Sequence, residues 1–171
     1  MKKIILAIMG LGLIAACGSK NEVPDRDVLV DSIEVMEQSL MNASVNTDLQ
    51  KADQMIALYD LFADNYPDDS LAPIYMMRSA EIEINTGSYE AGIATLDSIM
   101  NLYPGYEELP ICQFMKGTAY EMNQQYDLAR EAYTEFVERY PDHVLAADTR
   151  KILPYVGLTP EEQLEAIMGK I

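Results

Sequence analysis

From about residue 28 onward, apolar side chains recur at three- and four-residue spacing, the period of an amphipathic helix. No segment alternates apolar and polar residues beside a hairpin turn, as a pair of β-strands would require. The pattern predicts an all-helical chain with long helices over residues 28–44, 70–86 and 107–123. A second helix is expected after each of these, ending shortly before a proline.

The second helices all end in the same dipeptide. Tyr-Pro pairs recur every 37 residues, at Tyr66-Pro67, Tyr103-Pro104 and Tyr140-Pro141. Other apolar positions coincide under the same shift, namely Tyr59 with Leu96 and Tyr133, and Phe62 with Ile99 and Phe136. A residue before proline is driven out of helical geometry, so each proline should stop its helix, with the tyrosine packed at the junction.

The predicted helix starts and turns follow the same period. Residues 47–50 have the form of a capping box, and Gly87-Ser88 pairs a helix-ending glycine with a helix-starting serine. Pro73 and Pro110 fall near helix starts, where a missing N–H does little harm. A repeated helix, turn, helix, turn unit is typical of an α-solenoid, in which neighbouring repeats bury one another's apolar faces.

The third repeat also carries a family signature. Its small, aromatic, alanine and proline positions are Gly117, Tyr120, Tyr126, Ala129, Tyr133 and Pro141. This spacing resembles the tetratricopeptide repeat (TPR). The preceding unit matches less fully, because Glu83 replaces the aromatic residue and Gly92 the alanine. The 37-residue period, longer than the common one, resembles the repeats of BamD-like and CpoB-like envelope proteins.

The resemblance implies a TPR-type α-solenoid of antiparallel helix pairs. Three repeats are expected, over residues 28–67, 70–104 and 107–141, followed by terminal helices within 142–171. The first terminal helix should run from Asp142 to Leu153 and stop at Pro154. Thr159, followed by proline and two glutamates, predicts the start of a last helix that caps the solenoid.

The first 16 residues have the features of a secretory signal peptide, with two lysines followed by a short apolar run and small residues. Residues 14–17, Ile-Ala-Ala-Cys, resemble the lipobox of bacterial lipoproteins, which implies cleavage before Cys17 and lipid attachment to its sulfur. Because no aspartate follows the cysteine, the resemblance implies sorting to the outer membrane of a Gram-negative cell envelope. Residues 17–27 are polar and unpatterned and are expected to form a flexible tether.

The net charge and the reactive side chains of the sequence limit the functions that the chain can have. With 12 basic and 28 acidic residues the net charge is −16, which disfavours nucleic-acid binding and serves either solubility or attraction to a basic partner or cation. Cys112 is interpreted as a buried apolar residue and His143 as a solvated turn residue. Without a nucleophile motif, a phosphate loop or a metal-binding spacing, we expect no enzyme, cofactor or metal.

The family resemblance implies a partner-binding groove along the first helices of the repeats. Its candidate residues in this chain are Ile74, Met77, Glu81, Ile84 and Asn85, and then Ile111, Phe114, Thr118, Glu121 and Met122. The apolar members of this set also fit simple packing against adjacent helices. We expect a non-catalytic scaffold that binds a protein or peptide partner in the envelope. The alternative is a structural module that associates with itself.

Overall fold

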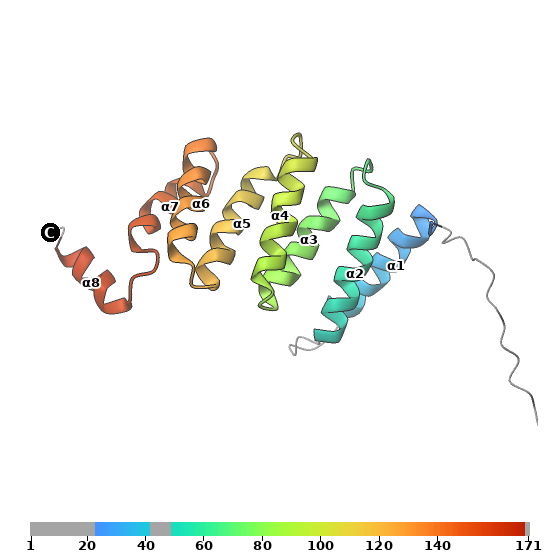
Figure 1. The fold of residues 1–171 in the computed structure, drawn as a ribbon, viewed down its shortest axis with the longest axis horizontal. Helices are drawn as coiled ribbons and strands as arrows, with labels where there is room; N and C mark the ends of the chain where they lie inside the picture. The colour runs from blue at the N-terminus through green and yellow to red at the C-terminus, as the bar shows by residue number, and fades with distance from the viewer. Residues whose placement is uncertain (1–22, 42–48, 170–171) are drawn as a thin grey trace, which may run out of the picture.

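The computed structural model describes residues 23–41 and 49–169, and within them every regular element is helical. The α-helices are α1 (Arg26–Met41), α2 (Leu49–Asn65), α3 (Ala72–Asn85), α4 (Tyr89–Leu102), α5 (Leu109–Met122), α6 (Tyr126–Arg139), α7 (Ala146–Ile152) and α8 (Pro160–Met168). A short 3-10 helix, η1 (Leu153–Tyr155), continues α7. The helices follow one another in a single row (Figure 1).

Each helix from α1 to α7 packs on the next one in the sequence, and the pairs α1/α2, α3/α4 and α5/α6 correspond to the three expected repeats. The fold is therefore a TPR-type α-solenoid, and the all-helical prediction is confirmed. The turns that follow α2, α4 and α6 lie along one edge of the row, and those that follow α3 and α5 lie along the opposite edge (Figure 1).

The three Tyr-Pro turns, which recur every 37 residues, share one hydrogen-bond pattern. In the first turn the amide of Tyr66 donates to the carbonyl of Phe62, that of Asp69 to Tyr66, and that of Ala72 to Asp69. The same bonds recur at the next two turns, where Tyr106 and His143 take the place of Asp69. Each turn therefore ends one helix and sets the start of the next in a fixed geometry.

In the first and third turns, the second residue after the proline also accepts a hydrogen bond from the amide of the residue that precedes the next helix. The Asp69 carboxylate accepts from the amide of Leu71 at 2.9 Å, and Nδ1 of His143 accepts from the amide of Leu145 at 3.3 Å. The His143 ring also lies 5.4 Å from the ring of Phe136. His143 is therefore more than a solvated turn residue, because both its ring and one of its nitrogens have structural contacts.

The C-terminal ends of α3 and α5 lie at the edge opposite the Tyr-Pro turns (Figure 1). After α3, Gly87 has a φ of +88° and donates its amide to Ile84, while Ser88 donates to Glu83. These two bonds form a Schellman motif, as expected for a helix-ending glycine. Ser88 does precede α4, but its side chain makes no capping bond. The capping box expected from Thr47 lies outside the described residues.

The apolar core is divided along the row in the way a solenoid requires. One cluster joins α1, α2 and α3, a second joins α3, α4 and α5, and two more join α5, α6 and the segment that follows. Phe62, Leu96 and Phe136, which lie on the predicted second helices, are fully buried. Cys112 is also fully buried, as predicted, and burial raises the pKa of its thiol to about 12.

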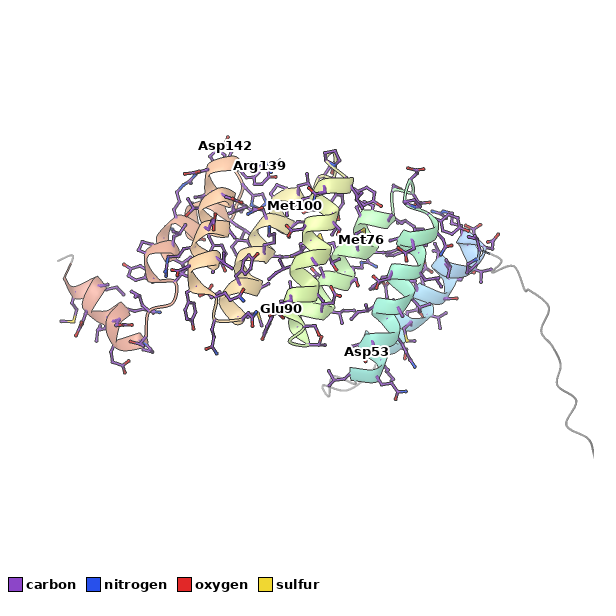
Figure 2. The ribbon with its side chains drawn as sticks, viewed as in Figure 1. Asp53, Met76, Glu90, Met100, Arg139 and Asp142 are labelled. Carbon is purple, nitrogen blue, oxygen red and sulfur yellow. The ribbon has the colours of Figure 1, made fainter. Side chains whose placement is uncertain are left out.

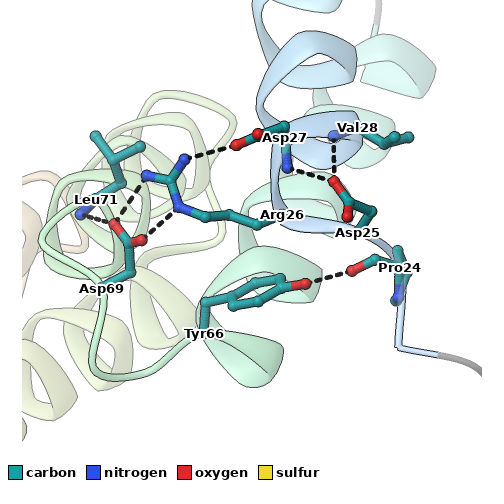
Figure 3. Close-up of polar contacts among 8 residues, drawn as sticks. All are labelled: Pro24, Asp25, Arg26, Asp27, Val28, Tyr66, Asp69 and Leu71. Atoms are coloured by element: carbon teal, nitrogen blue, oxygen red, sulfur yellow. Dashed lines mark hydrogen bonds and ion pairs between the residues drawn. The ribbon is translucent and has the colours of Figure 1, made fainter.

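The N-terminal segment is attached to the first Tyr-Pro turn (Figure 3). The Tyr66 hydroxyl donates to the carbonyl of Pro24 at 2.6 Å, and Nε of Arg26 donates to Asp69 at 2.6 Å. Asp25 caps α1 by accepting from the amide of Asp27 at 3.0 Å. Residues 24–27 were expected to belong to the flexible tether, and this boundary is wrong, because these contacts fix them to the domain.

At the C-terminal end α7 begins at Ala146, later than expected, because the residues after Pro141 form the third turn. Pro154 lies within η1, so the chain continues through one more helical turn beyond α7. Thr159 starts α8 with the expected capping box, in which its side chain accepts from the amide of Glu162 and its amide donates to the Glu162 carboxylate. Leu164 and Met168 of this last helix are more than half exposed.

Candidate functional site

The candidate groove residues occupy equivalent positions on α3 and α5, so the structure brings the two sets onto neighbouring first helices. Exposed members are Glu81 and Asn85 on α3 and Met122 on α5. Half-buried members are Ile74, Met77, Ile111, Phe114, Thr118 and Glu121. This surface thus has an apolar lining with polar and acidic side chains at its open positions.

Ile84 is a correction to this set, because only 5% of its surface is exposed. It belongs to the core cluster between α3, α4 and α5. The cause is Gly92 on the facing helix α4. A Cβ at Gly92 would lie 2.6 Å from Cγ1 of Ile84, so the isoleucine fills the space that an alanine at this repeat position would take.

Phe114 packs mainly against the neighbouring helix α6. Its ring lies 5.4 Å from that of Tyr133 and 5.5 Å from that of Phe136, within the range of favourable aromatic pairs. Met77 has a comparable contact, because Sδ of Met77 accepts from the Tyr106 hydroxyl at 3.6 Å. Both side chains therefore make contacts within the protein and are only partly exposed at the surface.

Glu121 and Thr118 are held in place by a buried tyrosine. The Tyr133 hydroxyl donates to the Glu121 carboxylate at 2.9 Å and lies 3.3 Å from the Thr118 hydroxyl. Burial, together with the nearby Glu121 carboxylate, raises the pKa of Tyr133 to about 12. The carboxylate of Glu121 is thus positioned by α6 and is half-buried in the surface of α5.

A cleft lies at the Tyr-Pro edge and was not among the predicted sites. It has a volume of about 830 Å³ and lies between the turn after α2 and the turn after α4. We call it the turn cleft. Its apolar lining consists of Pro67, Pro73, Ile74, Leu102, Tyr103 and Tyr106. Ile74 is therefore the member of the predicted groove that also lines this cleft.

Carboxylates surround the turn cleft. Asp68 and Asp69 come from the first turn, and Glu107 and Glu108 from the second. Neither pair has the residue spacing of a calcium-binding loop, so neither predicts a site by itself from the sequence. The signal that connects them is the 37-residue repeat itself, because it brings consecutive Tyr-Pro turns to one edge of the solenoid.

No group of three His, Cys, Asp or Glu side chains in residues 23–41 and 49–169 is arranged to hold a metal ion. Within the same residues, no helix has both the length and the apolar character needed to span a membrane.

The stacked helix pairs, the repeated Tyr-Pro turns and the first-helix surface together define a repeat protein of the protein-interaction class. Residues 112–143, which cover most of α5, all of α6 and the third Tyr-Pro turn, match the family model of the tetratricopeptide repeat. Among the curated proteins, a comparison with the chain finds no match. Tetratricopeptide repeats are in general non-catalytic and bind proteins, so the chain has the architecture of a protein–protein interaction scaffold.

Proposed function

We propose that this chain is a lipid-anchored protein of the bacterial cell envelope whose solenoid holds a protein or peptide partner without catalysing a reaction. The observation that carries the binding part is the register of α3 and α5. Glu81 and Asn85 are exposed on α3, and Met122 is exposed at the position of α5 that is equivalent to Asn85. A continuous surface built from successive repeats is how solenoids bind extended partners.

The anchor part rests on the residues before the domain. The lysines at positions 2 and 3, the apolar run and the Ile-Ala-Ala-Cys motif ending at Cys17 support lipidation. Acyl chains at Cys17 would hold the protein at the membrane stably, since each buried methylene contributes about 0.8 kcal/mol. Pro24 lies seven positions after Cys17, and a fully extended chain over that distance spans at most about 25 Å. The first Tyr-Pro turn would then lie close to the membrane surface.

A photo-crosslinking amino acid placed along the chain tests the binding surface in native membranes. We expect one and the same partner to be joined at position 85 and at position 122. Matched positions outside the surface are Asp53 and Glu131, which are also exposed. Asp53 lies at the edge of the solenoid opposite the Tyr-Pro turns (Figure 2). Equal capture at all four positions, or capture at the control positions alone, would refute the assignment.

The anchor is tested by the variant Cys17→Ala and a labelled fatty acid. The wild-type chain should incorporate the label and stay with the membrane after a high-salt wash, and the variant should do neither. If the wild type takes up no label, or if the variant remains in the membrane fraction, the proposed lipid anchor is wrong.

A second candidate function is self-association, and the exposed apolar side chains of α8 favour it. Leu164, Ile167 and Met168 have 57%, 50% and 63% of their surface exposed. A solenoid end that leaves such side chains uncovered is suited to contact another copy. Sedimentation of the full chain in neutral detergent decides this, because a monomer at high micromolar concentration excludes it.

A further inference from the structure

We propose that the turn cleft binds a short peptide segment that carries a lysine or arginine beside an aliphatic side chain. This inference deepens the proposed scaffold function and rests on it, but it concerns a different surface from the first-helix groove. Of the ten predicted groove residues, only Ile74 lines the turn cleft.

The cleft offers apolar surface that a ligand can cover. Leu102, the last residue of α4, lines it with 65% of its surface exposed. Tyr103 and Tyr106 beside it are half-buried, and Pro73 forms a fully packed part of the lining. A volume of about 830 Å³ is large enough for a few amino-acid residues. An aliphatic side chain placed against Leu102 would remove apolar surface of both partners from water.

The rim of the cleft selects a basic ligand. Asp68, Glu107 and Glu108 are exposed there, and none of the described basic side chains forms an ion pair with them. Asp69 differs, because it is neutralised by Arg26. The cleft therefore presents three carboxylates around an apolar floor. Such an arrangement attracts a cationic segment and disfavours an acidic one.

Other occupants fit this chemistry less well. Nucleic acid is repelled by the carboxylates. Within the described residues, the adjacent basic side chains that a second copy could offer are those of Arg150 and Lys151. Within the chain, Arg150 already donates to the carbonyl of Val137 at 3.1 Å, and Lys151 donates to Asp148 at 2.7 Å. A separate peptide segment with unengaged basic groups is the better partner.

The test uses the full chain in neutral detergent and three fluorescent peptide probes of equal length. One alternates lysine and leucine, one replaces each lysine by glutamate, and one replaces each leucine by glycine. We expect binding, followed by anisotropy, for the lysine–leucine probe alone, and we expect this binding to weaken with added salt. Sedimentation of the same samples should show one chain per complex.

Two pairs of variants locate the binding. Asp68→Asn with Glu107→Gln should weaken the lysine–leucine probe about tenfold, because two partly screened ion pairs are lost. Asp53→Asn with Glu131→Gln changes the net charge equally at exposed positions away from the cleft and should change binding less than twofold.

The apolar lining is tested in the same way. Leu102→Ser should weaken binding at least fivefold, whereas Leu164→Ser, at an exposed position of α8, should leave it unchanged. Equal losses in cleft and control variants would show non-specific charge attraction and overturn the proposal, as would tight binding of the glutamate probe. A dimer in which the cleft is covered would overturn it in favour of a second copy.

The two proposals can fail separately. If the lysine–leucine probe does not bind while crosslinking at positions 85 and 122 captures a partner, the turn cleft inference is wrong and the scaffold function stands. If the probe binds the cleft but the first-helix positions capture nothing, the groove assignment is wrong instead.

Discussion

At the end of α5, a non-glycine residue occupies a position of the repeat whose backbone conformation favours glycine. Gln124 lies 37 residues after Gly87 and has a φ of +58°, the one positive φ among the described non-glycine residues. Its amide donates to Glu121, and the amide of Gln125 donates to Tyr120, so the same Schellman motif ends α5 as ends α3. We predict that Gln124→Gly stabilises the protein and that Gly87→Ala destabilises it.

The magnitude follows from backbone geometry. A residue with a Cβ in the left-handed region costs about 1–2 kcal/mol. Substitution by glycine removes this cost, but it also makes the unfolded chain more flexible, which destabilises the folded state by about 0.5–1 kcal/mol. The net gain for Gln124→Gly is therefore about 0.5–1 kcal/mol. A Cβ at Gly87 would meet no atom within 4 Å, so the loss for Gly87→Ala is conformational and of about the same size.

Chemical and thermal unfolding followed by circular dichroism measure both effects. For a chain of this length, 1 kcal/mol corresponds to a shift in Tm of about 2–4 °C. Gly105→Ala is the matched control, because a Cβ there also meets nothing within 4 Å and its φ is not positive. This substitution should be neutral or slightly stabilising.

Two results would refute the reasoning. If Gln124→Gly lowered the free energy of unfolding, the left-handed conformation at this position would carry no penalty. If Gly105→Ala and Gly87→Ala were equally damaging, the loss at Gly87 would have another cause than its positive φ.

Three further changes have defined outcomes. Gly117→Ala would place a Cβ 2.5 Å from the ring of Tyr133, so we expect about 2 kcal/mol of destabilisation in urea unfolding, because the buried ring must shift. Burial raises the pKa of Glu83 above its ordinary value near 4.5, so the stability contributed by its neutral form is present below that pH and is lost as the pH rises through the folded pKa. Glu83→Gln, which can still accept from Thr95, should therefore raise Tm at pH 8 and not at pH 4. Cys112 should resist alkylation in the native protein and react once the chain is unfolded in urea, as read by peptide mass mapping.

The fold could be predicted because its signals are local and repeated. Proline stops, the glycine at the end of α3 and the threonine cap of α8 each act within a few residues, and the 37-residue shift then aligns the whole unit. The start of α7 was missed because His143 and its neighbours belong to a turn whose bonds copy those of the first Tyr-Pro turn. The sequence does not reveal this shared bond pattern, because the residues at the equivalent position of the three turns, Asp69, Tyr106 and His143, are chemically different.

The exposure of the predicted groove residues follows the family register only in part, because a register carried over from a family ignores local differences in volume. Glu81, Asn85 and Met122 are exposed where the register places them. Ile84 fails because glycine replaces alanine at position 92, and the space left on α4 draws the isoleucine into the core. A single facing residue thus decides whether a groove position belongs to the surface.

The turn cleft depends on contacts between segments that are far apart in sequence. Its two walls are separated by the whole of α3 and α4, so neither acidic pair signals a site by itself. The same turn also receives the N-terminal segment, through the bond between Tyr66 and Pro24 and the ion pair between Arg26 and Asp69 (Figure 3).

This shared position links the two proposals physically. If Cys17 is lipidated, the attachment of Pro24 to the first Tyr-Pro turn keeps Asp68 and the turn cleft near the membrane, within the short reach of the intervening chain. The proposed groove would follow α3 and α5, the first helices of the second and third repeats. A partner with a basic segment beside the membrane and a further segment extending from it would contact both surfaces at once. Binding at one surface would then raise the effective concentration of the partner at the other.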